Sequence, residues 1–207
     1  PGDLSAAAFF IVGATIVPGS DVTVTGVGVN PTRTGLLEVL QRMGADIQLL
    51  NRRDEAGEPV ADIRVKSASL RGITIGADLI PQTIDEFPIL CVAAAVAEGQ
   101  TTITGAEELR VKESDRIATM ATELRAMGAQ ILEQPDGMVI QGLGRHKENG
   151  RLTATLGQSH GDHRVAMSIA IGALTATRET RVSDTDCIDT SFPDFNDKLL
   201  ALLTASR

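Results

Sequence analysis

The sequence predicts an α/β fold made of a repeated unit of about 80 residues, with a third copy that is incomplete. Hydrophobic residues form 43% of the chain but only five residues are aromatic, all of them Phe, so the core must be aliphatic. Ala-rich apolar runs recur three times, each followed by a turn and an alternating segment, which is typical of a buried helix and a half-buried strand. Matched glycines repeat as well: Gly19 and Gly99 are 80 residues apart, and Gly44 and Gly128 are 84 apart.

The elements of each copy are expected in the order helix, strand, helix, strand, strand. The copies open with SAAAFFIVGATIVPGSDVTVTGV (5–27), DEFPILCVAAAVAEGQTTITGA (85–106) and RVAMSIAIGALTATRETRVS (164–183). Amphipathic helices are expected at 31–44, 113–128 and 192–205. Strand pairs are expected at 46–50 with 61–66 and at 130–133 with 138–141, and a linking strand near 73–76. Polar hairpin or loop segments are expected at 51–59 and 144–150. Any Ala-rich α/β protein shows some self-similarity, so true repetition is an interpretation.

Composition excludes several classes of function. The net charge of −8 makes the chain a poor generic binder of nucleic acid or of an anionic membrane, so a few placed cations must hold any anionic substrate. Cys91 and Cys187 are isolated thiols, which suits a reducing cytoplasm. The apolar runs at 6–17 and 87–97 are too short to span a bilayer. The sequence therefore predicts a cytoplasmic protein.

Familiar cofactor motifs are absent from the sequence. It contains no GxxxxGK[ST] loop, no GxGxxG after a strand, no GxSxG or HExxH, and no Cys/His cluster with metal-ligand spacing. We therefore expect neither a metal site nor a nucleotide loop.

The repeat indicates where anions would bind. Ser5, Asp85 and Arg164 each stand fourteen residues before the matching turn position, at or beside the start of a buried helix. Helix N-termini offer free backbone N–H groups and partial positive charge. If the copies pack around a pseudo-threefold axis, these starts converge on one face.

The segment 110–116 (RVKESDR) is the densest charged cluster. Lys112 and Arg116 are four residues apart and would share a helix face once the helix has begun, forming a site for phosphate or carboxylate. Glu113 beside them is a candidate proton donor or acceptor if buried. The alternative is a capped, solvated helix start.

Two further helix starts carry candidate residues. In 161–164 (GDHR), Asp162 is expected to be an N-cap, His163 either a proton shuttle or a loop-orienting residue, and Arg164 a cation that needs an anionic partner. In 84–88 (IDEFP), Asp85 and Glu86 open a hydrophobic helix, and plain N-terminal capping is the alternative to a functional role.

Five ordered segments carry a resemblance to a known family: PGDLSAAAFF (1–10), IDEFPIL (84–90), RVKESDR (110–116), GDHRVAM (161–167) and TSFPDF (190–195). Together they resemble the 5-enolpyruvylshikimate-3-phosphate synthases, and resemble much less the sister transferase that acts on UDP-N-acetylglucosamine. The resemblance implies a fold of two domains, each of three βαβαββ units around a pseudo-threefold axis. It implies that residues 1–207 are a single domain, the C-terminal half, whose last unit is completed by the N-terminal stretch of the whole chain.

The resemblance also implies roles for site residues. Asp85 matches the acid that contacts the substrate hydroxyls and accepts a proton, and Glu113 matches the acid that protonates the methylene carbon of phosphoenolpyruvate. Lys112 matches a contact to shikimate 3-phosphate. Arg116 and Arg164 match the two arginines that hold phosphoenolpyruvate.

Three neighbouring positions need separate comment. His163 adjoins the implied site. Thr190 stands where some family members have a Lys that contacts phosphoenolpyruvate, and Glu108 stands where some have a substrate-binding Asn. Thr190 in place of this Lys leaves one expected contact to phosphoenolpyruvate in doubt.

The reaction implied is transfer of the enolpyruvyl group from phosphoenolpyruvate to the 5-hydroxyl of shikimate 3-phosphate, with release of phosphate, in aromatic amino acid biosynthesis and without a cofactor. The other half of the family's cleft, with its Lys-Ser-Arg set and Gly-rich loop, is absent, so the chain is expected to need this N-terminal domain as its partner and to be inactive alone. The alternatives are a stand-alone domain that binds small phosphates without turnover, and half of the sister transferase.

Overall fold

A computed structural model describes residues 1–144 and 150–205, and its elements follow the expected repeat. The first unit contains α1 (Leu4–Ile16), β1 (Asp21–Gly28), α2 (Gly35–Arg42), β2 (Asp46–Glu55) and β3 (Glu58–Lys66). Helix α1 is buried almost completely because it is apolar on every side. Asp3 caps it by accepting the N–H of Ala6 at 3.0 Å. The strands form an antiparallel sheet in the order β1-β3-β2.

The second unit repeats this plan and adds the linking strand. Its elements are β4 (Thr74–Ile75), the short 3₁₀ helices η1 (Ile80–Gln82) and η2 (Ile84–Glu86), α3 (Phe87–Val96), β5 (Glu98–Ile103), the 3₁₀ helix η3 (Glu107–Val111), α4 (Arg116–Ala126), β6 (Gln130–Gln134) and β7 (Gly137–Leu143). The sheet order is β4-β5-β7-β6. Strand β4 is parallel to β5, and the other two pairings are antiparallel.

The third unit contains β8 (Leu156–Gln158), α5 (His163–Ala173), β9 (Arg181–Ser183), α6 (Asp186–Asp189) and α7 (Phe195–Thr204). Within residues 150–205 no strand follows β9, so this unit lacks the hairpin that ends the other two. β8 and β9 pair in parallel.

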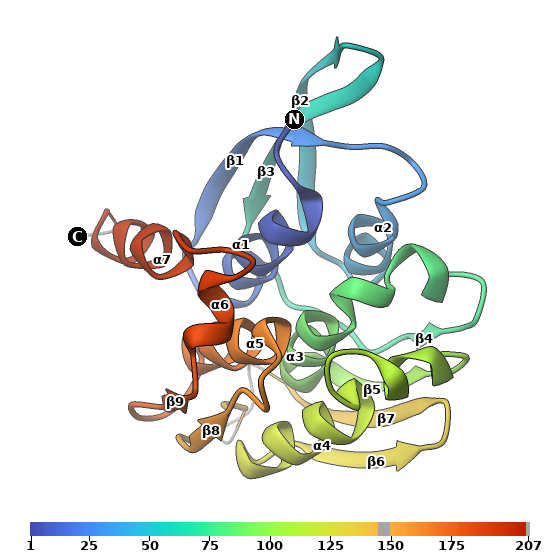
Figure 1. Cartoon of the computed structure of the whole chain (residues 1–207), viewed down its shortest axis with the longest axis vertical. Helices are drawn as coiled ribbons and strands as arrows, with labels where there is room; N and C mark the ends of the chain where they lie inside the picture. Colours follow the sequence, from blue (N-terminus) through green and yellow to red (C-terminus); the bar gives the residue numbers. More distant parts are fainter. Residues whose placement is uncertain (145–149, 206–207) are drawn as a thin grey trace.

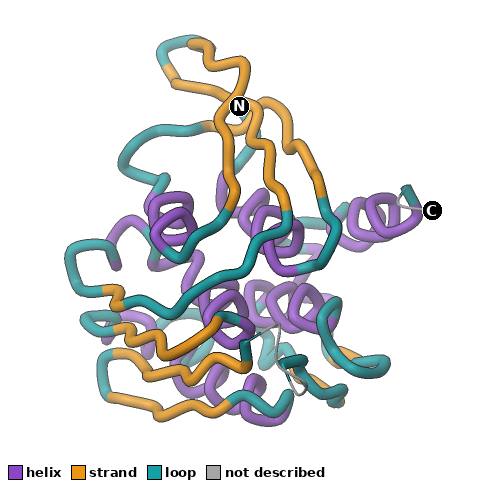
Figure 2. The backbone as a smooth tube through the Cα atoms, turned by 180° about the vertical axis from the view of Figure 1, so that it is seen from behind, coloured by secondary structure: helices purple, strands orange, loops and turns teal. Residues whose placement is uncertain are grey.

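A parallel strand pair around a buried helix recurs in all three units. Gly2 bridges to Val27 in parallel around α1, β4 pairs with β5 around α3, and β8 pairs with β9 around α5. A parallel pair requires a crossover connection, and here the buried helix provides it. In Figure 1, α1, α3 and α5 occupy the middle of the molecule, and Figure 2 shows the strands from behind, around these helices. The three helices contact one another in every pairing and form one aliphatic core.

The expected hairpin or loop at 51–59 is a hairpin, and its two strands are longer than expected. Strands β2 and β3 run through it and pair as far as Glu55 and Glu58, leaving only Ala56 and Gly57 to form the turn, both with left-handed backbone (φ 57° and 87°). The end of this hairpin is exposed and carries ion pairs such as Arg53–Glu55, so it has no hydrophobic alternation from which a strand is recognised. The other expected loop, 144–150, lies largely outside the described residues.

The amphipathic helices are shorter than expected at their N-terminal ends. Asp115 caps α4 by accepting the N–H of Ala118 at 3.0 Å, so residues 113–115 precede the helix. The expected glycine stops are confirmed, because Gly44 and Gly128 follow α2 and α4 with φ of 100° and 87°. Within the described part of the chain, no helix has the length and apolar character needed to cross a membrane.

Close packing of β7 against the end of α3 gives a stability prediction. A Cβ at Gly142 would lie 2.1 Å from the carbonyl oxygen of Ala97, whereas a Cβ at Gly13, inside α1, would meet nothing closer than 3.5 Å. Gly142→Ala should therefore destabilise the chain by about 1–3 kcal/mol or more. Gly13→Ala should stabilise it by about 0.5–1 kcal/mol through helix propensity. Urea unfolding of both variants checks this, and equal or improved stability of Gly142→Ala would contradict the packing.

Candidate active site

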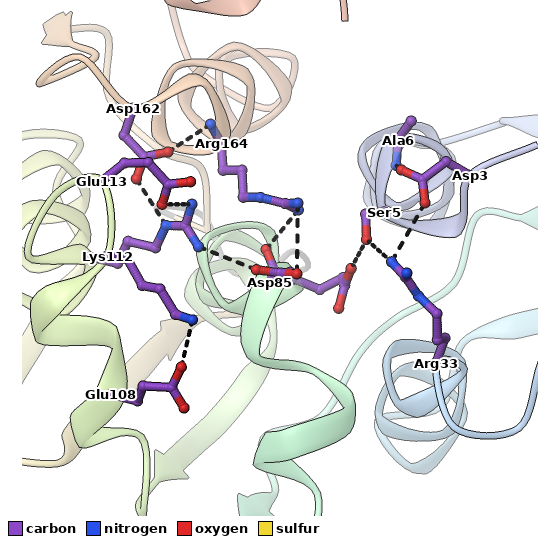
Figure 3. Close-up of polar contacts among 12 residues, drawn as sticks. Asp3, Ser5, Ala6, Arg33, Asp85, Glu108, Lys112, Glu113, Asp162 and Arg164 are labelled. Carbon is purple, nitrogen blue, oxygen red and sulfur yellow. Dashed lines mark hydrogen bonds and ion pairs between the residues drawn. The ribbon is translucent and has the colours of Figure 1, made fainter. Parts of the chain in front are cut away.

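Charged side chains from the starts of α3, α4 and α5 meet at one end of the buried helices (Figure 3). Asp85 comes from η2, directly before α3. Lys112 and Glu113 come from the segment between η3 and α4, and Arg116 is the first residue of α4. Arg164 lies in the first turn of α5. The repeated crossover places the starts of α3 and α5 together, because each of these helices follows the first strand of its parallel pair. The start of α4 is joined to them by the ion pairs of Arg116.

Arg116 is the centre of this cluster. Its side chain is only 1% exposed and lies within reach of three carboxylates. Nε donates to Asp162 at 2.8 Å and one terminal nitrogen, Nη2, donates to Glu113 at 2.7 Å. The other, Nη1, is buried, has no hydrogen-bond partner in the described residues, and lies 3.5 Å from Asp85. A buried cation requires such compensation, and one of its donors remains available.

Asp162 is the buried carboxylate that fixes the position of the Arg116 side chain. Its side chain is 0% exposed, caps α5 by accepting the N–H of Arg164 at 2.9 Å, and also accepts the hydroxyl of Ser114 at 3.1 Å. Burial by itself would raise the pKa of Asp162, but the hydrogen bond and charge of Arg116, with the other two donors, outweigh it and lower the pKa. The expected N-cap is confirmed, and the same carboxylate also joins α5 to α4.

Arg164 and Asp85 form the open edge of the cluster. Arg164 donates through Nη1 to the backbone oxygen of Asp85 at 3.0 Å, and its Nη2 lies 3.9 Å from the Asp85 carboxylate. The Asp85 side chain is 43% exposed, so a solvent-accessible carboxylate faces two guanidinium groups. This is a favourable arrangement for a substrate that is both a hydroxyl donor and an anion.

Lys112 does not share a helix face with Arg116, which corrects the expectation. Helix α4 begins only at Arg116, and Lys112 has extended backbone at the end of η3. In Figure 3 its side chain points to Glu108, with Nζ 2.6 Å from Oε1. Glu108 is mostly exposed, so this is a surface ion pair from which the lysine is easily released.

His163 is the first residue of α5. Burial is the main cause that lowers the pKa of its imidazole, and the charge of Arg164 lowers the pKa further. The ring is therefore neutral at pH 7 and has a nitrogen that can accept a proton. Both a shuttle and an orienting role remain compatible with this position.

The interpretation of Asp85 and Glu86 as plain caps is wrong, because neither side chain bonds the N-terminus of α3. Glu86 is buried and accepts the hydroxyl of Ser5 at 2.5 Å, and Arg33 donates to the same hydroxyl at 3.2 Å. Burial raises the pKa of Glu86, which the Ser5 hydrogen bond only partly counters. This link between α1 and α3 was missed, since no local pattern distinguishes a buried Glu from an exposed one.

Thr190 adds no cation to the site. It ends α6, and its hydroxyl donates to the backbone oxygen of Cys187 at 2.7 Å. The cluster therefore relies on Arg116 and Arg164. Within residues 1–144 and 150–205, no group of His, Cys, Asp or Glu is arranged to hold a metal ion.

The charged face is open. A crevice of ≈ 30 Å³ lies between the starts of α1 and α5, with Ser5, His163 and Arg164 in its lining. A larger cavity of ≈ 320 Å³ lies at the opposite ends of the buried helices, beside Ile16, Val96 and Leu174. The smaller crevice adjoins the charged cluster through Arg164, whereas Arg116 and Asp85 do not line it.

The Arg116–Asp162 pair gives a second prediction. Asp162→Asn should destabilise the chain by about 3 kcal/mol, because it leaves a buried guanidinium without its main counter-charge. The same change at Asp194, whose ion pair with Lys198 is exposed, should alter stability by less than about 0.5 kcal/mol. Because the folded pKa of Asp162 is lowered, its contribution is present above its unfolded pKa of about 3.8 and is lost as pH falls through the folded value. Urea unfolding at pH 7 and near pH 3 measures both effects, and equal losses for the two variants at pH 7 would contradict the analysis.

Comparison with known proteins identifies relatives of this chain. The sequence model described as EPSP synthase (3-phosphoshikimate 1-carboxyvinyltransferase) matches residues 1–199. A 3-phosphoshikimate 1-carboxyvinyltransferase of Geobacter sulfurreducens is 57% identical over 195 residues, which are 94% of this chain and 44% of the relative. One from Gloeobacter violaceus is 54% identical, over 96% of this chain and 45% of the relative.

Solved structures of enolpyruvyl transferases also resemble this chain. A structure of EPSP synthase from Acinetobacter baumannii superposes with a TM-score of 0.91 at 48% identity, covering 95% of this chain and 45% of that one. The enolpyruvyl transferase NikO from Streptomyces tendae, at 18% identity and a TM-score of 0.68, shares the fold. The predicted enolpyruvyl transferase-like α/β fold is thus confirmed, and the chain spans less than half the length of these relatives. The family match over residues 1–199 and the identity to its curated members show that the chain belongs to the EPSP synthase family.

Proposed function

We propose that this chain supplies one half of the active-site cleft of a 3-phosphoshikimate 1-carboxyvinyltransferase. The reaction transfers the enolpyruvyl group of phosphoenolpyruvate to the 5-hydroxyl of shikimate 3-phosphate and releases phosphate, a step of aromatic amino acid biosynthesis in the cytoplasm. Residues 1–207 would form its C-terminal domain, and the partner would be the N-terminal domain of the same enzyme.

One observation carries the proposal: the buried Arg116 has a terminal nitrogen, Nη1, that has no hydrogen-bond partner among the described residues. It lies 3.5 Å from the half-exposed carboxylate of Asp85, which Arg164 also approaches. An unsatisfied buried donor is costly unless a ligand completes it. A planar carboxylate or a phosphate suits a guanidinium, which donates in a fixed fork. We assign the carboxylate and phosphate of phosphoenolpyruvate to Arg116 and Arg164.

The remaining residues would carry the second substrate and the protons. Lys112, released from Glu108, would bind the 3-phosphate of shikimate 3-phosphate. Asp85 would accept the proton of the 5-hydroxyl while that oxygen attacks C2 of phosphoenolpyruvate, and Glu113 would deliver a proton to C3. A tetrahedral ketal phosphate forms. Breaking the C2–O bond to phosphate and removing a methyl proton then restores the double bond.

Asp85→Asn tests the proton-accepting role in the complete enzyme. The amide keeps the shape of the side chain but cannot accept a proton, so kcat should fall about 10²–10⁴-fold while both KM values stay within about 3-fold. Asp78→Asn is the matched control, because Asp78 is exposed seven residues earlier, and it should retain full turnover. Near-normal kcat for Asp85→Asn would remove Asp85 from this role.

A second test separates the proposal from its alternatives. Phosphate release from phosphoenolpyruvate and shikimate 3-phosphate is measured with the chain alone and after adding the rest of the enzyme. The chain alone should be inactive, because the carboxylates of Asp85 and Glu113 are about half exposed to bulk water, where a charge pair at about 4 Å is worth only about 1 kcal/mol. A closed cleft would make the same charges effective. Turnover by the chain alone would refute the half-cleft argument. Turnover of the assembled enzyme only with UDP-N-acetylglucosamine, or phosphate binding without any turnover, would favour one of the alternatives.

A further inference from the structure

The loop 158–162 delivers three residues to the charged cluster. It leaves β8, turns, and enters α5, so it sets the position of Asp162, His163 and Arg164. His160 and Gly161 are consecutive residues with left-handed backbone (φ 54° and 72°). This conformation is unfavourable for a residue with a side chain, so contacts outside the loop must maintain it.

Glu123 of α4 provides such contacts. Its side chain is 6% exposed, and one carboxylate oxygen accepts the backbone N–H of Gln158 at 3.1 Å. The other oxygen lies 2.7 Å from Nε2 of His160. A single buried carboxylate therefore holds both the end of β8 and the left-handed turn.

The same helix also holds the other end of the loop. Arg116 lies seven residues before Glu123, about two helical turns, so the two side chains project from the same face of α4. Arg116 bonds Asp162 while Glu123 bonds Gln158 and His160. Helix α4 thus hydrogen-bonds to the loop at both of its ends.

Strand β8 packs closely beside the Glu123 carboxylate. A Cβ on Gly157 would lie 2.9 Å from Ile169 of α5 and 3.4 Å from the Glu123 carboxylate. Strand β8 therefore fits directly between α4 and α5. An apolar side chain at 123 would fill the same space, but a carboxylate adds directional bonds that define where the loop lies.

We infer that Glu123 and His160 are positioning residues for the anion site: they fix the loop 158–162 so that Asp162 directs Arg116, and α5 directs Arg164, toward phosphoenolpyruvate. This inference rests on the proposed function of the cluster. Neither residue touches the substrate in this account. Their effect passes through Asp162 and Arg164.

The test uses the complete enzyme and steady-state kinetics. Glu123→Ala and His160→Ala should raise KM for phosphoenolpyruvate about 10-fold or more, the range for losing a hydrogen bond to a charged group. KM for shikimate 3-phosphate and kcat should stay within about 3-fold. His160→Gln, which retains an N–H donor at the end of its side chain, should recover most of the loss. Glu123→Gln, which keeps the volume and one acceptor for Gln158, should have an intermediate effect.

A purely structural role predicts a different pattern. Lower stability would reduce the concentration of active enzyme, and so the apparent kcat, while KM for phosphoenolpyruvate stayed unchanged in all four variants; that result would overturn the inference. Glu38→Ala serves as control, since the Glu38 carboxylate forms an exposed ion pair with Arg42 on α2, and it should change neither KM.

Hydrogen exchange gives a readout that does not depend on activity. In Glu123→Ala, the backbone amides of 157–164 should exchange about 10-fold faster than in the parent enzyme, whereas those of β5 and β7 should not change. Unchanged exchange at 157–164 would refute the positioning role. If the parent enzyme released no phosphate, the proposed function would fail, but the exchange measurement would still decide whether Glu123 fixes the loop.

Discussion

The buried guanidinium of Arg116 is the group on which the arrangement of the site depends. It is shielded from water, so it requires carboxylates around it. These come from three separate helix starts, as Asp85, Glu113 and Asp162. Asp162 is the buried counter-charge of Arg116. Because Asp162 also caps α5, one carboxylate fixes α4 and α5 relative to each other. Asp85 and Glu113 complete the shell from the open side.

The repeated crossover makes this convergence possible. In each unit the buried helix connects two parallel segments, so α1, α3 and α5 start at the same end of the core. Helix N-termini favour anions, and Arg164 lies in the first turn of α5 at this end. In the proposed function, a chain with a net charge of −8 would bind an anionic substrate through the two placed cations Arg116 and Arg164 and not through its overall charge.

Much of the fold could be predicted from the sequence, because aliphatic helices that are apolar all round, such as α1 and α3, have a clear signature, as do the glycine stops at Gly44 and Gly128. The extent of the strands in the exposed hairpin could not be predicted, since residues that are polar on both faces show no hydrophobic alternation. For the candidate site, the order of charged motifs identified helix starts whose side chains meet in the structure. The pairing of Arg116 with Asp162, 46 residues apart, and the burial of Glu86 arise only from tertiary packing, which no local pattern encodes.

The central claim is that Nη1 of Arg116, which has no hydrogen-bond partner in the described part of the chain, binds the substrate anion in the proposed function. It is tested most directly by a crystal structure of the complete enzyme with phosphoenolpyruvate and shikimate 3-phosphate bound in an inactive Asp85→Asn variant. The account predicts a carboxylate or phosphate oxygen of phosphoenolpyruvate at hydrogen-bond distance from Nη1 of Arg116, with Arg164 on the same molecule. Phosphoenolpyruvate bound elsewhere, with Arg116 contacting only its three carboxylates, would contradict it.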